Sequence, residues 1–298
     1  MKRCIRLLGI AVLLALFGAE LFILSNSVRA GAYLGFYRVW HAVWPFTAGQ
    51  RLPEDSFHLF GLVQPVWLEV EPGVTMRLDP KDMVTRAILV NRTWEPSTTD
   101  ALMRRLPPGG TFVDVGAHVG WYSLKAAKVV GPNGRVIAID PNREILAELR
   151  ANIAASKAAS IVTVVPVACA ASESTLTFYA TARGNTGESS LARANASQDF
   201  SIAASYPVRA RRLDDILKDA AVSRVDEIKI DVEGAEFLVL QGAADTLARF
   251  RPLMAVEVND RQLKAMGSSA AEVTAFLRSH GYEAEGRHEE NVLFVPAR

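Results

Sequence analysis

From residue 111 onward, short apolar segments alternate with segments that have the spacing of helices, and this alternation constrains the fold more than any other feature. The apolar segments are residues 111–116, 135–140, 162–170, 227–234, 253–258 and 291–296. The segments with helical spacing are residues 121–130, 143–156, 235–250 and 269–282. Strands this short and apolar, when helices separate them, predict a mostly parallel sheet with helices on both faces.

Three regions are predicted from the change of composition along the chain. In residues 1–24, an apolar run from Leu7 to Leu24 follows Lys2, Arg3 and Arg6, which predicts a membrane-attachment segment. A cleaved signal peptide and a helix lying on the membrane surface are the alternatives. Residues 25–100 form an accessory region with a β-hairpin at residues 66–78, and residues 101–298 form the α/β domain.

A polar insertion interrupts the α/β pattern between the third and fourth strands. Residues 174–180 and 206–212 have the pattern of a hairpin, and residues 180–200 between them are polar and contain glycine. A loop of this length is typical of a lid over a binding site, with a plain surface excursion as the equal alternative.

Charge and cysteine content exclude several classes of function. The formal net charge is +1, which disfavours binding to bulk nucleic acid. The cysteines Cys4 and Cys169 lie in different contexts, so no disulfide framework is predicted. The five histidines are scattered, and no group of residues has the spacing of zinc ligands.

Acidic side chains end four of the predicted strands. Ligands of parallel sheets bind beyond the carboxyl ends of the strands, and these ends carry Asp114, Asp140, Cys169, Asp231 and Glu257. Acids gathered at a ligand-binding edge predict that a cationic ligand binds between them.

The segment that follows the first strand predicts which ligand this is. Gly116 and Gly120 allow a sharp turn into a helix whose N-terminal amides suit a carboxylate or phosphate. A dinucleotide site needs the second glycine of G-x-G-x-x-G, where this chain has His118 in GAHVG, and Asp114 would repel a pyrophosphate. S-adenosylmethionine carries a sulfonium, an ammonium and a carboxylate, and Asp140 is placed to bind its ribose hydroxyls.

A second acidic pair follows the fourth strand. Asp231 and Glu233 alternate with apolar residues, so both carboxylates lean the same way and repel each other unless a cation lies near. That cation is a sulfonium, a substrate amine, Lys229 or a divalent metal. Because two carboxylates are too few to define a metal centre, no metal site is predicted.

Several motifs together resemble the FkbM family of methyltransferases over roughly residues 91–283. They are WEP at 94–96, DVGAHVGWYSLKAA at 114–127, GPNGRVIAIDPN at 131–142, LDDIL at 213–217, IKIDVEGAEFLVLQGA at 228–243 and PLMAVEV at 252–258. The resemblance implies the class I methyltransferase fold, S-adenosylmethionine as methyl donor, and usually O-methylation of a hydroxyl. It maps the donor pocket to Glu95, Asp114, Gly116, Gly120, Asp140 and Asp231, and the family's carboxylate motif to Glu233.

The predicted cofactor site also includes Ala117, His118 and Asn142. His118 stands where the family usually has asparagine, and Asp140 where it usually has glutamate. Asp231 or Glu233 is the predicted base that takes the proton of the acceptor hydroxyl, with Glu257 in reserve. A bound metal that lowers the pKa of the hydroxyl is the alternative.

The predicted acceptor is a hydroxyl of a sugar, a glycolipid or a natural product. The donor is made in the cytosol, so the catalytic domain is expected on the cytoplasmic side, although the positive N-terminal flank favours an exported domain. An NAD-dependent oxidoreductase and a membrane-tethered binding protein without turnover are the alternative functions.

Overall fold

The computed structural model describes residues 64–182, 184–196 and 201–297. The predicted membrane-attachment segment therefore lies outside the described residues. Within the described ranges, no helix is both long enough and apolar enough to cross a membrane.

A seven-stranded sheet forms the centre of the molecule, in the order β11-β12-β10-β9-β3-β4-β5. Its strands are β3 (Thr111–Val115), β4 (Arg135–Ile139), β5 (Val162–Val165), β9 (Glu227–Ile230), β10 (Leu253–Glu257), β11 (Tyr282–His288) and β12 (Asn291–Pro296). The strands from β10 to β5 are parallel, and β12 runs antiparallel to β10 and β11. This mostly parallel sheet confirms the predicted α/β class I methyltransferase fold.

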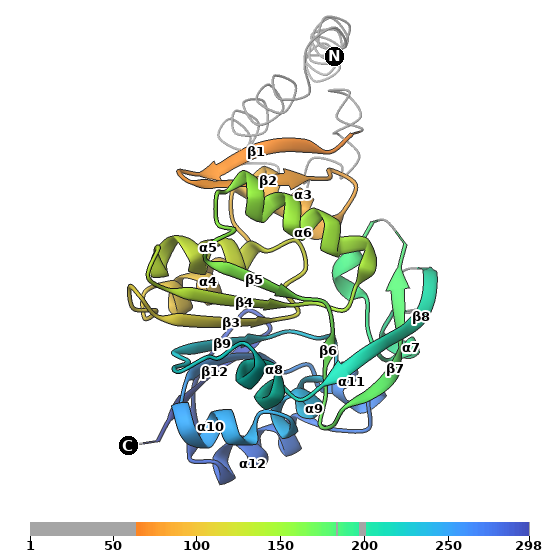
Figure 1. Ribbon diagram of the computed structural model, residues 1–298. Coiled ribbons are helices and arrows are strands. Elements are labelled where there is room, and N and C mark those ends of the chain that lie inside the picture. The colour runs from red at the N-terminus through yellow and green to blue at the C-terminus, as the bar shows by residue number, and fades with distance from the viewer. Residues whose placement is uncertain (1–63, 183, 197–200, 298) are drawn as a thin grey trace, which may run out of the picture.

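Helices cover both faces of this sheet (Figure 1). On one face lie α3 (Met83–Asn91), α4 (Pro96–Met103), α5 (Trp121–Val130) and α6 (Arg143–Ala155). On the other lie α8 (Leu213–Asp219), α9 (Glu236–Gln241), α10 (Ala244–Phe250), α11 (Asp260–Ala265) and α12 (Ala270–Ser279). Alternate residues of β3 supply the two cores, because Phe112 packs on the α5 side and Val113 and Val115 on the other. Asp114 shares the face of Phe112.

The accessory hairpin is present as predicted. Strands β1 (Val66–Glu71) and β2 (Val74–Leu78) pair antiparallel, and Gly73 takes the positive φ of +84° that their turn requires. The backbone of β2 is bonded to α6, where Asn152 Oδ1 accepts from the amide of Arg77 at 2.7 Å. The hairpin therefore packs into the same core as one face of the central sheet.

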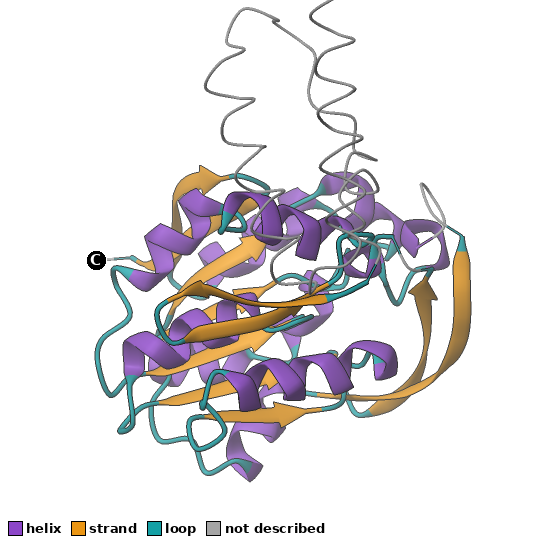
Figure 2. Ribbon diagram, turned by 90° about the horizontal axis from the view of Figure 1, so that it is seen from above, coloured by secondary structure: helices purple, strands orange, loops and turns teal. Residues whose placement is uncertain are grey.

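The predicted strand over residues 162–170 is wrong as a single element. Pro166 has no amide hydrogen to donate, and the chain leaves the central sheet there. Residues 168–169 form β6 (Ala168–Cys169), which joins β7 (Ser174–Thr181) and β8 (Ile202–Arg211) in a separate sheet. Strands β7 and β8 pair antiparallel, so the predicted hairpin is confirmed, and they lie at one side of the molecule in Figure 1 and Figure 2.

The predicted helix over residues 235–250 divides into α9 and α10 near Gly242. A Cβ atom at Gly242 would lie 2.2 Å from the carbonyl oxygen of Ala170, so close approach of β6 requires a glycine there. The apolar residues of α9 and α10 have the same helical spacing, so the sequence pattern does not show the break between the two helices. Strand β11 was not predicted, because six of its seven residues are partly or fully exposed.

Candidate functional site

A cavity opens at the carboxyl ends of β3, β4 and β9, where the order of the sheet strands reverses. Its volume is about 1020 Å³, including the open mouth. Seven of the predicted site residues line it: Gly116, Ala117, His118, Asp140, Asn142, Asp231 and Glu233. The other three, Glu95, Asp114 and Gly120, do not line it.

The turn after β3 packs directly against the end of β9. The amides of Gly116 and Ala117 both donate to the carbonyl of Ile139, at 2.9 and 3.1 Å. Gly116 has a φ of +88°, and a Cβ atom there would lie 1.7 Å from the carbonyl oxygen of Asp231. Glycine is therefore required, both for the backbone conformation and for the approach of the two strand ends.

Asp140 is held by two backbone donors at the end of β4. The amides of His118 and Asn142 each donate to one of its carboxylate oxygens, both at 2.8 Å. Burial raises the pKa of Asp140 above its ordinary value, although these two donors oppose the rise. Because a carboxylate oxygen has a further lone pair, Asp140 retains acceptor capacity toward the cavity it lines.

The polar insertion supplies one wall of the cavity. Thr186, in the short helix η2 (Thr186–Glu188), has its hydroxyl 2.8 Å from His118 Nε2 and donates it to Asp82 Oδ2 at 2.8 Å. Ser190 Oγ donates to the backbone carbonyl of Glu233 at 2.8 Å, just before α7 (Arg193–Ala196). The insertion thus spans the cavity from the accessory region to the end of β9, as expected of a lid.

Asp114 lies in the interior, next to the cavity. Its side chain is 1% exposed and accepts a hydrogen bond from Ser123 Oγ at 2.6 Å. Burial raises its pKa to about 6, and this hydrogen bond and the charge of Lys229 oppose the rise. The predicted contact between Asp114 and a ligand stays a prediction, since the side chain is satisfied by protein neighbours here.

Glu95 also lies behind the cavity wall. Tyr122, which lines the cavity, donates its hydroxyl to Glu95 Oε2 at 2.5 Å, and Asn291 Nδ2 donates to Oε1 at 3.0 Å. Burial raises the pKa of Glu95, and the charge of Lys229 opposes the rise. Glu95 thereby fixes Tyr122 in the wall and connects α4 to β12.

Lys229 is the central buried cation of the site. It is 1% exposed in β9, and its Nζ donates to Asp231 Oδ2 at 2.8 Å and lies 5.2 Å from the ring centroid of Tyr122. Burial alone would lower the pKa of Lys229, but the carboxylates of Asp231 and Glu95 raise it, so the ammonium stays charged. The sequence pattern left Lys229 as one of four cations that could lie beside Asp231 and Glu233. A lysine inside an apolar strand is itself a signal of a buried ion pair.

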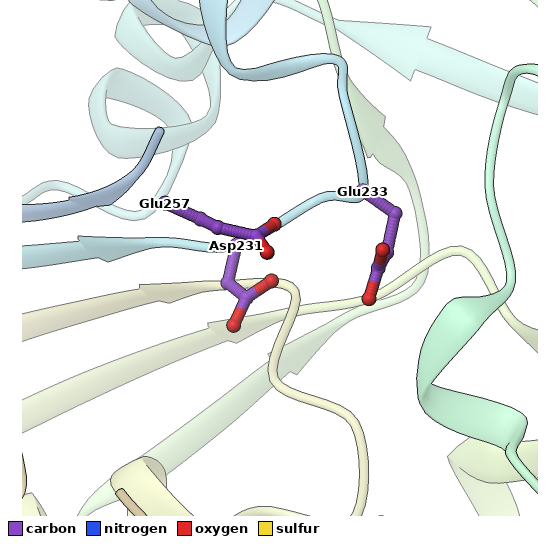
Figure 3. A group of neighbouring side chains, drawn as sticks. All are labelled: Asp231, Glu233 and Glu257. Atoms are coloured by element: carbon purple, nitrogen blue, oxygen red, sulfur yellow. The ribbon is translucent and has the colours of Figure 1, made fainter. Parts of the chain in front are cut away.

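Three carboxyl groups converge beside Lys229. Asp231 and Glu233 follow β9, and Glu257 ends the adjacent strand β10; one oxygen from each lies within 4.8 Å of the others (Figure 3). Burial would raise the pKa of Asp231, but Lys229 outweighs burial and holds it below its ordinary value. Burial and then the charge of Asp231 raise the pKa values of Glu233 and Glu257 well above the ordinary range.

The sheet order, the glycine turn and the acid-lined cavity together define a protein of the class I methyltransferase fold. Residues 114–284, more than half of the chain, match the family described as the Methyltransferase FkbM domain. The chain belongs to the FkbM methyltransferase family.

The chain is also similar to curated proteins and to a solved structure. The chain is 28% identical over 257 residues to the AMB antimetabolite synthetase AmbE of Pseudomonas aeruginosa, covering 75% of this chain but only 12% of AmbE. It is 29% identical over 212 residues to the 31-O-demethyl-FK506 methyltransferase FkbM of Streptomyces tacrolimicus, covering 64% of this chain and 78% of that protein. A crystal structure of methyltransferase FkbM from Methylobacillus flagellatus aligns with a TM-score of 0.42 at 17% identity, over 71% of this chain and 52% of that one.

Proposed function

We propose that this protein binds S-adenosylmethionine in the cavity and transfers its methyl group to a hydroxyl group of the acceptor. The observation that carries the proposal is that Asp140 and Asp231 line the cavity on either side of the Gly116 turn. A sulfonium cation complements these carboxylates, whereas the pyrophosphate of a dinucleotide would meet repulsion. The Streptomyces relative, named as a methyltransferase for an O-demethyl compound, supports a hydroxyl as the acceptor group.

The donor fits the cavity in one orientation. Its ribose hydroxyls donate to Asp140, which the amides of His118 and Asn142 hold in place. Its carboxylate lies toward the first turn of α5, because the N-terminus of a helix favours an anion. This arrangement directs the methyl group toward the end of β9, where Asp231 and Glu233 lie.

Methyl transfer then needs alignment and one proton acceptor. The acceptor oxygen attacks the methyl carbon in line with the carbon–sulfur bond; the carbon–oxygen bond forms, and the electron pair of the broken bond stays on sulfur. The hydroxyl proton passes to a nearby carboxylate. Glu233 suits this role because its pKa is raised, while Asp231, paired with Lys229, is the weaker base and orients the reactants.

Calorimetric titration of the purified full chain with S-adenosylmethionine and with NAD tests the proposal. We expect saturable binding of one S-adenosylmethionine per chain and no binding of NAD. Binding of NAD alone would favour an oxidoreductase and contradict the proposal. Binding of the donor without methyl transfer to any acceptor would favour a binding protein instead.

We further propose that the acceptor is a sugar, glycolipid or natural product and that residues 1–24 attach the protein to a membrane with the catalytic domain in the cytoplasm. The apolar run from Leu7 to Leu24 behind Lys2, Arg3 and Arg6 supports the attachment. Mass spectrometry of cell-envelope sugars with and without this protein should show the loss of a methyl group, and unchanged spectra would exclude an envelope acceptor.

A further inference from the structure

We propose that Asp231, Glu233 and Glu257 bind a divalent metal cation of the Mg²⁺ or Mn²⁺ class. The binding itself goes beyond the proposed function, since it needs neither donor nor acceptor. Only its consequence for the acceptor hydroxyl rests on the proposed function.

The first observation is the geometry of the three carboxyl groups. They come from the carboxyl ends of the neighbouring parallel strands β9 and β10, and one oxygen of each lies within 4.8 Å of the other two. In Figure 3, the carboxyl group of Glu257 extends between Asp231 and Glu233. The backbone of Glu233 has a positive φ of 54°, which turns the chain at the residue that supplies one of the three carboxylates. Oxygen ligands at such separations suit a hard cation.

The second observation is an unpaired oxygen of Glu257, whose carboxyl group extends into this group (Figure 3). Glu257 is 8% exposed, and its Oε2 has no hydrogen-bond partner among the described residues. A buried carboxylate oxygen without a partner is costly, and native proteins pair such atoms with a donor, a water or an ion. A cation between the three carboxylates supplies the missing partner.

The third observation is the balance of charge. Three ionised carboxylates and the ammonium of Lys229 leave two negative charges, which one divalent cation neutralises. Lys229 donates to Oδ2 of Asp231 and Gln262 Nε2 donates to Oε2 of Glu233, and these two donors do not use the second oxygen of either carboxylate. Asp231 and Glu233 are thus each oriented by a neighbouring donor, as ligands in metal centres usually are.

A shared proton is the competing explanation of the same geometry. A protonated Glu257 would donate a hydrogen bond to Asp231 and relieve part of the repulsion. A proton shared by Glu257 and Asp231 leaves the neighbouring carboxylate of Glu233 outside the arrangement, whereas a cation binds all three carboxylates.

A cation at this place has a direct chemical consequence for the proposed reaction. It binds the acceptor oxygen and lowers the pKa of the hydroxyl, so that the proton passes to solvent. Glu233 then serves as a ligand, and the general-base role proposed above applies to the cation-free protein.

Calorimetry and electron paramagnetic resonance with Mn²⁺ test the site on the full chain, treated with a chelator and free of donor. We expect one Mn²⁺ per chain, with the affinity lowered at least about ten-fold in Glu257→Gln and in Glu233→Gln. Glu227→Gln is the matched control, because Glu227 is a buried carboxyl at the opposite end of β9 and should leave the affinity unchanged. Circular dichroism shows which variants are folded, and Glu233, the more exposed ligand, provides a second variant if Glu257→Gln does not fold.

The outcomes separate this inference from the proposed function. Absence of a bound Mn²⁺ in the wild-type chain, or an affinity in both ligand variants equal to that of the wild type, overturns the metal site and supports the shared proton. If S-adenosylmethionine binds and methyl transfer proceeds in that chelated protein, the proposed function survives alone. If Mn²⁺ binds as expected while S-adenosylmethionine does not bind, the metal site stands and the proposed function fails.

Discussion

Burial raises the pKa of the carboxyl groups around the cavity, and the neighbour of each group adds to this rise or opposes it. Asp231 is ionised because Lys229 donates to it, while Glu233 and Glu257 face other acids in a buried setting. Asp114 is shielded by Ser123 and has a pKa of about 6. Acids of similar position in the sequence therefore have different roles, and Asp231 is the one that substitution should affect most.

Asp231→Asn should abolish turnover. The amide cannot balance the buried ammonium of Lys229, and it removes a carboxylate from the reacting end of the cavity. We expect the turnover number for methyl transfer to fall by at least about 100-fold. Asp100→Asn is the matched control, because Asp100 forms an exposed ion pair with Arg104 on α4 and should leave turnover unchanged. Wild-type turnover in Asp231→Asn would contradict the role assigned to this residue.

Gly116→Ala should disrupt the site through the backbone. The new Cβ atom would lie 1.7 Å from the carbonyl oxygen of Asp231, so the ends of β3 and β9 must separate. Gly109 has a similar φ of +73° but open space around it, so Gly109→Ala isolates the conformational cost of roughly 1–2 kcal/mol. We expect thermal unfolding and donor titration to show a larger loss of stability, and loss of binding, for Gly116→Ala only. Equal effects of the two substitutions would show that the close contact is unimportant.

Helices and strands were predictable where burial is regular. The helix predicted at residues 121–130 coincides with α5, and the predicted strand at residues 111–116 with β3 to within one residue. The errors occur where a distant contact decides the outcome, as at Gly242 against Ala170, or where Pro166 moves the chain to another sheet.

The acids of the candidate site were predictable from the sequence, but their contacts with residues far away in the chain were not. Acids at the ends of parallel strands must gather at one edge, so Asp140, Asp231 and Glu257 were placed correctly at the carboxyl edge of the sheet. The contact between Glu95 and Asn291 joins residues far apart in the chain, and no local pattern reports it. The ion pair of Lys229 with Asp231 depends on the rotamers of the two side chains, and the sequence pattern does not predict rotamers.

The hydroxyl of Thr186 should control how long the donor stays bound. It connects the insertion to His118 and to the buried Asp82, so Thr186→Val removes two hydrogen bonds of about 1 kcal/mol each. We expect the dissociation rate of S-adenosylmethionine, measured by stopped flow, to rise by roughly 5–30-fold. Thr274→Val is the control, because its hydroxyl bonds only within α12. An unchanged dissociation rate would mean that the insertion does not act as a lid.

At the scale of the whole molecule, the acidic side chains at the two ends of the central sheet have different surroundings. The carboxyl ends of β9 and β10 hold Asp231, Glu233 and Glu257, and for each of them the charge of Lys229 opposes the rise in pKa that burial causes. At the opposite end of β9, Glu227 is 1% exposed and neither of its carboxyl oxygens has a hydrogen-bond partner among the described residues. Burial raises its pKa to about 8, although the charge of Arg105 opposes the rise.

Glu227→Gln should therefore stabilise the protein in a pH-dependent way. Between the ordinary pKa of 4.5 and the folded value of about 8, the folded state keeps a proton that the unfolded chain has released. The free energy of unfolding of the wild type thus falls as pH rises through this window, by up to about 1.4 kcal/mol per pH unit from this group, and levels off above it. Urea unfolding from pH 5 to 9 should show the advantage of Glu227→Gln growing with pH. Parallel curves for the two proteins would contradict this assignment.

We expect a cationic adenosyl donor to occupy the cavity where the order of the sheet strands reverses. A crystal structure of the full chain grown with S-adenosylhomocysteine, the product of the donor, tests it most directly. We expect the adenosyl group between the ends of β3 and β4, its ribose hydroxyls bonded to Asp140 and its sulfur directed toward Asp231. Density for the ligand elsewhere, or Asp140 turned away from a bound ribose, would contradict it.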